Sequence, residues 1–314
     1  MRPRWWHADL RPAIIERDRV TAEQGQEGVW RQHFRSIRRI KVDGLRVRYV
    51  DAGDGPCVFL IHGIGHSAFG WRHSIGPLAE SGFRVLAIDT PGFGYSDPLP
   101  QEAIRDPTAL PKAIADVLDR ILDTFDITSC AVIGHSLGGA YATLFAVEHP
   151  ERVERLVLAA PAVGPHVGLG VRVLTMRVGR LAFRPTSQFV RWSFSQLANS
   201  HGAIEDEEVE EIVRTLSQPQ VRKFFLDLLK LGLGLRGVRP DFVLLSRLAE
   251  VKAPTLVLWG RHDQILPFRN ADLILGQMPE ARLEVFERSG HMLMLEETNH
   301  FNDLVLRFLE PAAD

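Results

Sequence analysis

The sequence has few cysteines and carries no pattern of a metal or redox centre. Its 314 residues include only two cysteines, Cys57 and Cys130. Each lies in an apolar run, without the companion ligands of a zinc site and without CxxC spacing. Both are therefore expected to be buried thiols that behave as small apolar side chains. The sequence predicts no metal site and no cofactor.

Long apolar runs and excess charge are also missing. No run approaches the roughly 20 residues that span a bilayer, and Met1–Trp6 lacks the apolar stretch of a secretory signal. These absences predict a cytoplasmic protein with no membrane span. A net charge of −2 and a pI near 6.6 give no overall attraction to nucleic acid. The expected partner is a small-molecule substrate, and no pattern indicates an oligomeric state.

Residues 1–35 form an N-terminal extension that differs from the rest of the chain. Residues 1–41 contain ten basic and five acidic side chains, a net charge of +5, and three tryptophans, Trp5, Trp6 and Trp30. One interpretation is a basic arm that docks on a partner. The other is an extension packed by its tryptophans on the main domain, with its arginines in water. We favour the second, because charge-biased segments are usually solvated faces.

From residue 36 the chain alternates between strand and helix patterns. Strands are expected at 45–49, 57–61, 84–88, 130–133, 153–158, 255–259 and 282–286, and helices at 70–82, 109–126, 267–278 and 301–309. This order predicts an α/β fold with a mostly parallel sheet covered on both faces. The core would comprise residues 36–161 and 251–314.

Between the two parts of this core lies a segment with no strand pattern, residues 162–250. Its helical patterns are near 170–182, 187–198, 206–216 and 219–231. Because it is inserted between two strands, it should form an all-helical cap over one end of the sheet. We call residues 162–250 the cap. The acidic cluster at 205–211 is interpreted as the negatively charged N-terminus of a helix.

A candidate nucleophile lies between the apolar run that begins at Cys130 and an alanine-rich helix. The motif is Gly134-His-Ser136-Leu-Gly138. G-x-S-x-G between a strand and a helix is the nucleophile elbow, which exposes a serine hydroxyl on a sharp turn. The glycines leave room where side chains would clash. The Leu137 N–H at the helix N-terminus points toward developing negative charge.

Two further residues complete a candidate triad. A serine hydroxyl needs a base to take its proton, and His291 follows the last predicted strand. The histidine in turn needs a carboxylate that orients it, and Asp263 follows the preceding strand. The chain order Ser136, Asp263, His291 is the order expected for this type of elbow. All three residues follow strands, where open α/β sheets bind their ligands.

The loop after residue 61 is expected to supply the second oxyanion donor, the Ile64 N–H, beside that of Leu137. His62 is interpreted as a brace for this loop, and His135 as structural or pocket-lining. Four nearby residues are candidates for substrate contact: Gly65, His66, Phe69 and Trp71. For the last three, packing in the core or in a helix is an equal alternative.

The chain resembles the α/β-hydrolase superfamily from about residue 36 to residue 310. The resemblance rests on His62-Gly63, Asp89-x-Pro-Gly-x-Gly-x-Ser96, Gly134-His-Ser-Leu-Gly138, Gly260-x-x-Asp263 and Gly290-His291. It implies an eight-stranded, mostly parallel sheet with a helical cap inserted after the sixth strand. It also implies a serine hydrolase that forms an acyl-enzyme through a Ser-His-Asp triad.

Within this superfamily, three functions are weighed. Haloalkane dehalogenases and epoxide hydrolases of this fold use an aspartate where this chain has Ser136. The first expectation is a carboxylesterase for short- or medium-chain esters, because the residues beside His291 (Met292, Leu293, Met294) are apolar and suit an acyl chain. The second is a carbon–carbon bond hydrolase of ring-cleavage dienoates. The third is a non-catalytic ligand-binding protein.

The carbon–carbon hydrolase needs a cation for its anionic substrate. Arg184 or the pair Arg191-Trp192 could supply one from the cap, and Met292 lies beside the base. Relatives of this kind usually have an asparagine before the nucleophile and an aromatic residue after the base. Here those positions are His135 and Met292, which is why the ester is the first expectation.

Overall fold

The computed structural model describes residues 38–99, 110–174, 183–199, 204–234 and 237–310. Its main sheet has eight strands in the order β1-β2-β4-β3-β5-β6-β9-β10. The strands are β1 (Arg38–Val42), β2 (Leu45–Ala52), β3 (Cys57–Ile61), β4 (Arg84–Ile88), β5 (Cys130–His135), β6 (Val153–Ala159), β9 (Thr255–Gly260) and β10 (Arg282–Phe286). Among the described strands of this sheet, only the pairs β1–β2 and β2–β4 are antiparallel. The predicted mostly parallel α/β-hydrolase sheet is confirmed.

The strand at the sheet edge, β1, is absent from the strands expected by local pattern, although the resemblance implied eight. Its sequence has only two buried apolar side chains, Ile40 and Val42, among three basic residues. It pairs with β2 through a tight hairpin at Asp43-Gly44, where both residues have positive φ. Asp-Gly between alternating strands is the typical signal of such a hairpin.

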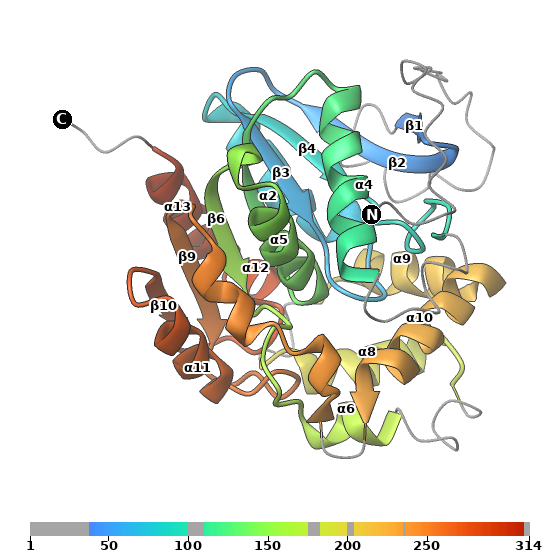
Figure 1. The fold of residues 1–314 in the computed structure, drawn as a ribbon. Helices are drawn as coiled ribbons and strands as arrows, with labels where there is room; N and C mark the ends of the chain where they lie inside the picture. The colour runs from blue at the N-terminus through green and yellow to red at the C-terminus, as the bar shows by residue number, and fades with distance from the viewer. Residues whose placement is uncertain (1–37, 100–109, 175–182, 200–203, 235–236, 311–314) are drawn as a thin grey trace.

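The central strands β3 and β5 are buried along their whole length because helices cover the sheet. Helices α4 (Leu110–Thr124) and α5 (Leu137–Glu148) pack together and stand in front of the strands in Figure 1. Helix α2 (Arg72–Glu80), which follows a 3-10 turn η1 (Ala68–Trp71), packs against the C-terminal helix α13 (Thr298–Leu309). Helix α11 (Arg269–Gln277) joins β9 to β10, and a short helix α12 (Leu293–Glu296) precedes α13. Both expected buried thiols, Cys57 and Cys130, are free and buried.

The cap helices lie beyond one end of the sheet, below it in Figure 1. They are helices α6 (Leu169–Leu174), α8 (Ser187–Leu197), α9 (Asp206–Ser217) and α10 (Pro219–Gly232), followed by the 3-10 turns η3 (Pro240–Phe242) and η4 (Leu245–Glu250). The expectation of an all-helical cap is wrong in one detail. Strands β7 (Leu233–Gly234) and β8 (Gly237–Val238) form an antiparallel ladder where the glycine-rich stretch ends α10.

Two expectations cannot be compared with the structure. The extension at residues 1–35 and the second half of the helix expected at 170–182 lie outside the described residues. Among the helices that the structure does describe, none is both long enough and apolar enough to cross a bilayer.

Candidate active site

Ser136 lies on the sharp turn between β5 and α5. Its backbone has φ 54° and ψ −119°, a conformation that strains any residue other than glycine. A Cβ on Gly134 would overlap the Gly138 carbonyl, and a Cβ on Gly138 would overlap the Ile61 carbonyl. The Ser136 N–H donates to the Ala159 carbonyl at 2.9 Å. Close packing of three strand ends therefore holds the serine in its strained turn.

The loops after β9 and β10 bring Asp263 and His291 together. His291 Nδ1 lies 2.7 Å from Asp263 Oδ2. Asp263 Oδ1 accepts the N–H groups of Ile265 and Leu266 at 2.8 and 2.9 Å. Because a carboxylate only accepts, Nδ1 of His291 carries the hydrogen and Nε2 is left with its lone pair. This tautomer is the one in which an imidazole acts as a base through Nε2.

The backbone around His291 is held on both sides. Glu296 accepts the Gly290 N–H at 2.9 Å and the Met292 N–H at 3.1 Å. His135 Nε2 lies 2.9 Å from the His291 carbonyl, so this nitrogen carries a hydrogen and donates it. Burial lowers the pKa of His135 well below its ordinary value, and a proton on His291 adds to the shift. His135 is thus a neutral brace for the candidate base, as the structural interpretation of this residue expects.

The loop of residues 62–68 reaches the nucleophile from β3. A Cβ on Gly63 would lie 3.1 Å from the Ser136 Cβ, so the loop passes directly against the serine. The turn hydrogen bonds here come from the amides of His66 and Gly139. Within the described part of the chain, the Ile64 and Leu137 amides donate no backbone hydrogen bond of this turn or loop kind. Two open N–H groups beside a nucleophile are what an oxyanion site requires.

His62 braces this loop as a neutral side chain. The Thr90 N–H donates to His62 Nε2 at 2.9 Å, so Nδ1 carries the hydrogen and donates to the Gly63 carbonyl at 2.7 Å. Burial lowers the pKa of His62 to about 4, although the charge of Asp89 opposes the shift. A histidine that stays neutral with both nitrogens engaged is not a competing base for the serine.

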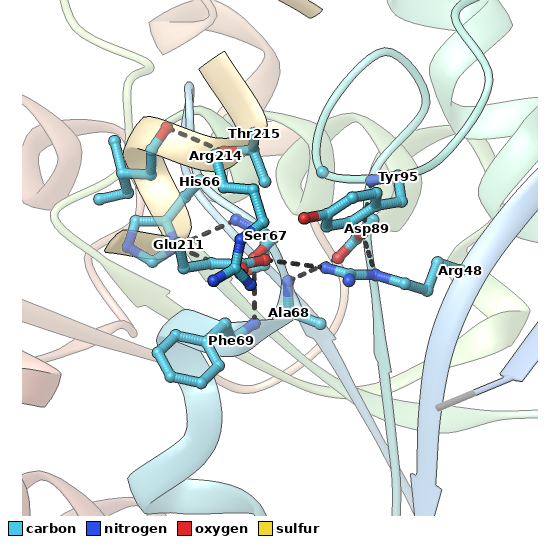
Figure 2. A network of polar contacts seen from close by, with 12 residues as sticks. Arg48, His66, Ser67, Ala68, Phe69, Asp89, Tyr95, Glu211, Arg214 and Thr215 are labelled. Atoms are coloured by element: carbon cyan, nitrogen blue, oxygen red, sulfur yellow. Dashed lines mark hydrogen bonds and ion pairs between the residues drawn. The ribbon is translucent and has the colours of Figure 1, made fainter. Parts of the chain in front are cut away.

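Next to the loop, buried charges join the core to the cap, and we call these residues the ion network. On one side, Arg48 Nε lies 2.5 Å from Asp89 Oδ2 and its Nη2 lies 3.3 Å from Glu211 Oε1. Figure 2 shows Glu211 of α9 between Arg48 and Ser67, with the Tyr95 ring stacked on the guanidinium. Ser67 Oγ donates to Glu211 at 3.3 Å.

The second part of the ion network is centred on Glu208, also on α9. Its Oε1 lies 2.6 Å from His66 Nε2, and its Oε2 accepts a hydrogen bond from Arg72. Arg72 also binds Glu205 at 2.8 Å. Burial acts to raise the pKa of Glu208, but the charges of His66 and Arg72 outweigh it and lower the pKa to about 2. Burial acts to lower the pKa of His66, and the Glu208 charge raises it above 6.5.

Several expected substrate-contact residues pack elsewhere. Phe69 is fully buried, and the Arg72 guanidinium carbon lies 4.6 Å from the centroid of its ring. The Trp71 ring lies 6.1 Å from that of Phe301 on α13. Both side chains therefore serve core packing, which was the equal alternative for them. His66 is buried against Glu208, as described above.

The three cap candidates lie in different surroundings. Arg191 binds Asp206 at 2.6 Å and its side chain is 49% exposed. Trp192 is 60% exposed. Arg184 is exposed too, but the preceding ring, Phe183, stacks on Phe225 at 5.4 Å.

Phe225 in turn covers the loop of residues 62–68. A Cβ on Gly65 would lie 3.1 Å from its ring. Of the two cap arginines considered, Arg184 is therefore the one next to a side chain, Phe183, that packs toward the site. Met292 is buried beside the candidate base His291. Gly65 itself has φ +72°, a conformation suited to glycine.

Sequence reasoning missed the role of the acids on α9. Glu208 and Glu211 are 0% and 1% exposed, whereas the sequence pattern indicated only the negatively charged N-terminus of a helix. A signal was present: the two glutamates are three residues apart and share a face with Val209 and Ile212, both buried. Acids on the apolar face of an amphipathic helix indicate buried partners.

Comparisons with known proteins agree with this fold and geometry. A family model described as serine aminopeptidase, S33, matches residues 55–298. A 2-hydroxy-6-oxononadienedioate/2-hydroxy-6-oxononatrienedioate hydrolase of Comamonas testosteroni is 32% identical, over 88% of this chain and 95% of that protein. A 2-hydroxy-6-oxo-6-phenylhexa-2,4-dienoate hydrolase of Burkholderia cepacia has the same identity and coverage.

The solved structures agree as well. A meta-cleavage product hydrolase from Pseudomonas fluorescens has a TM-score of 0.74 at 28% identity, over 86% of this chain and 96% of that one. The fold, the family match and these relatives lead to one conclusion. This chain belongs to the α/β-hydrolase superfamily of serine hydrolases, in the family described as serine aminopeptidase, S33.

Proposed function

We propose that this hydrolase cleaves a carbon–carbon bond in 2-hydroxy-6-oxo-dienoates, the products of aromatic ring cleavage. The sequence alone favoured an ester substrate. The relatives reverse that order, because those at 32% identity are named as hydrolases of 2-hydroxy-6-oxo compounds and align over nearly their whole length. The geometric support is the His291–Asp263 contact of 2.7 Å beside a serine held in a nucleophile elbow.

In this proposal the triad and the two amides have separate tasks. Ser136 is the nucleophile, His291 Nε2 takes its proton, and Asp263 holds the imidazole and stabilises its positive charge. The Leu137 and Ile64 N–H groups bind the oxyanion that forms when the serine adds to a carbonyl. These steps are shared by esters and by 6-oxo compounds, since both present a carbonyl carbon to the serine.

Cleavage of a carbon–carbon bond places one further demand on the site. When Ser136 adds to C6, the electrons of the C5–C6 bond must leave onto C5. They are stabilised only if the substrate has first become the 2-oxo tautomer, in which C5 is conjugated with the C2 carbonyl. C5 gains its new hydrogen in that tautomerisation, so cleavage releases a dienolate with its charge on the C2 oxygen. The imidazolium of His291 supplies the proton that this oxygen takes up, and water hydrolyses the acyl-enzyme. The products are a carboxylic acid from the C6 side and a 2-hydroxydienoate.

The substrate carboxylate needs a cation. We assign this task to Arg184 and not to Arg191, because Arg184 adjoins a ring that packs toward the site, whereas Arg191 lies on α8 beside the exposed Asp206. Arg184 follows Phe183, which stacks on the ring that covers Gly65. Gly65 and Met292 are the other proposed substrate contacts.

A carboxylesterase is the second candidate, and one observation favours it. Met292, Leu293 and Met294 are all nearly fully buried beside the base, which gives an apolar surface suited to an acyl chain. His135 stands where relatives that cleave dienoates usually have an asparagine.

The test compares a 2-hydroxy-6-oxo-6-phenylhexa-2,4-dienoate with p-nitrophenyl esters of graded length. Under the proposal, dienoate kcat/KM exceeds that of the best ester. Arg184→Ala should raise KM for the dienoate by about tenfold, the effect of one lost charge-assisted contact, and leave the KM of neutral esters unchanged. Arg191→Ala is the matched control and should change neither value. Faster ester turnover, indifferent to Arg184, would reverse the assignment in favour of the esterase.

A further inference from the structure

The oxyanion-side loop, residues 62–68, is anchored by the core at its two ends. At the start, the Thr90 N–H holds the His62 ring at 2.9 Å. At the end, the Ala68 N–H donates to Asp89 Oδ1 at 2.8 Å. Both anchors belong to the loop after β4, so the core fixes where the segment begins and ends.

The middle of the same loop is held by the cap. His66 Nε2 lies 2.6 Å from Glu208, and Ser67 Oγ lies 3.3 Å from Glu211. A Cβ on Gly65 would meet Phe225 of α10 at 3.1 Å and Leu216 of α9 at 4.0 Å. Three consecutive residues, 65 to 67, therefore contact the cap directly after Ile64, whose N–H is the proposed oxyanion donor.

Buried charge makes this attachment specific. Glu208 and Glu211 are almost wholly removed from water, and an ionised carboxylate in that setting must stay paired and hydrogen-bonded. Glu208 is paired with Arg72 of the core, and Glu211 is paired with Arg48 of the core and with Arg214 of its own helix. Helix α9 therefore has few positions in which Glu208 can pair with Arg72 while Glu211 pairs with Arg48. Each of those positions also determines where the His66 and Ser67 side chains lie.

We propose that Glu208 and Glu211 are positioning residues that align the Ile64 N–H with Ser136 by holding His66 and Ser67, so that the cap completes the oxyanion hole. The proposal rests on the serine-hydrolase part of the proposed function and not on its substrate class. Neither glutamate touches the reacting atoms. The cap consequently determines the rate of the chemical step as well as the choice of substrate.

A purely structural role predicts a different result. If the ion network only joined cap to core, its loss would lower the melting temperature and the fraction of active molecules, but kcat per active site would stay constant. A positioning role lowers kcat per active site and weakens binding of transition-state analogues by the same factor, while substrate KM changes little.

The experiment uses the full chain with Glu208→Gln and Glu211→Gln, which remove charge and keep shape. Glu210→Gln is the matched control, because Glu210 is an exposed acid on the same helix. Active sites are titrated with a fluorophosphonate. The readouts are the phosphonylation rate, kcat and KM for p-nitrophenyl butyrate, and the Ki of an alkyl boronic acid, which forms a tetrahedral adduct on the serine.

We expect each variant to lose about 10- to 100-fold in phosphonylation rate and in kcat per titrated site. This is below the roughly 10²- to 10³-fold loss when an oxyanion donor is removed outright. The boronic acid Ki should rise by the same factor, and KM should change by less than about threefold. Values per titrated site within twofold of Glu210→Gln, with a lowered melting temperature, would show a structural network and overturn the proposal.

Ser67→Ala keeps the test decisive if a glutamine variant fails to fold. It removes the hydroxyl that donates to Glu211 and accepts the Phe69 N–H without burying an unpaired charge, and it should reduce the phosphonylation rate several-fold. In Ser67→Ala/Glu211→Gln the losses should not add, because both changes break one link. A wild-type rate in Ser67→Ala, or full additivity, would contradict the positioning role.

Failure of the proposed function would look different. If the wild-type chain is phosphonylated at Ser136 but does not turn over dienoates, only the substrate class falls and the cap–loop link stands. Absence of label at Ser136 would instead remove the serine-hydrolase assignment, and the positioning role with it.

Discussion

The two sides of the site are held in different ways. On the side of the base, Asp263 is fixed by the amides of Ile265 and Leu266, and His291 by Asp263 and His135. All of these groups lie on the core. On the oxyanion side, the loop of residues 62–68 depends on buried carboxylates from the cap.

The difference has a physical consequence. Backbone amides that follow a strand are placed by the sheet, so the base side should tolerate changes in the cap. Its cap contacts in the described chain are made largely by backbone N–H groups: that of Asn199 donates to Glu296 at 2.8 Å, and that of Gly168 donates to the Ile265 carbonyl at 2.8 Å. Ion pairs between separate elements hold only while both elements stay in register, so the oxyanion side should respond to the cap. Each prediction below tests this division.

The largest effect is expected at Ser136, where the two sides meet. Ser136→Ala should lower kcat by about 10⁶-fold, because nucleophile and base act as one unit. The melting temperature should stay close to that of the wild type. Ser136→Gly should be equally inactive but more stable than Ser136→Ala by about 1–3 kcal/mol, since glycine relieves the strain at φ 54°. Equal stability of the two variants in urea unfolding would argue against a strained elbow.

Asp263→Asn should have the next largest effect and should act on the base side alone. An amide in place of the carboxylate favours the wrong tautomer of His291, and we expect kcat to fall by about 10⁴-fold. The boronic acid Ki should rise only slightly in comparison, because the oxyanion donors are untouched. A matching rise in Ki would show that the two sides are not independent. Turnover assays and inhibition on the same preparation provide the measurement.

Phe224→Ala tests an apolar contact between cap and core. Phe224 packs against Gly92 and lies 5.2 Å from the Phe93 ring. Removing a buried ring should lower the free energy of unfolding by about 3–5 kcal/mol. The exposed Leu169, on α6, is the control, and Leu169→Ala should change stability by less than about 0.5 kcal/mol.

Substrate preference should shift in Phe224→Ala, while the phosphonylation rate per titrated site stays near that of the wild type. Only the ion network, and not every cap contact, is expected to reach the oxyanion donor. A rate loss in Phe224→Ala as large as that of Glu208→Gln would contradict this distinction.

The smallest effect is a pH dependence that arises on the cap side. The pKa of His66 is raised by Glu208, so the pair stabilises the fold below pH 6.5 and this contribution is lost as pH rises through the raised pKa. One proton limits the slope to about 1.4 kcal/mol per pH unit. Urea unfolding between pH 6 and 9 should show a free energy of unfolding that falls with pH, by no more than this slope, in the wild type. The fall should be smaller in His66→Gln.

Glu208 gives a pH dependence of stability with the opposite sign. The pKa of Glu208 is lowered to about 2, so its contribution is present above its ordinary value of 4.5 and is lost as pH falls toward 2. Glu208→Gln should therefore remove part of the stability loss in this acid range. Identical profiles for wild type and variant would show that Glu208 is not ionised in the folded protein.

Much of the fold and of the base side could be predicted from local sequence. Apolar runs followed by glycine-rich turns place Ser136, Asp263 and His291 after strands, and parallel strands bring their carboxyl ends to one edge. The hairpin strand β1 was missed because it has only two apolar residues facing the core. The strands of the cap were missed because they are two residues long.

The oxyanion side was decided by the tertiary structure. The pattern of α9 reveals that two acids share its apolar face, but not which cations meet them. Arg72 and Glu208 are 136 residues apart in the sequence, and Arg48 and Glu211 are 163 apart. Local spacing determines turns, helices and strand ends, because those depend on neighbouring residues. Pairing of buried charges depends on how the cap is set on the core, and only the folded chain determines that.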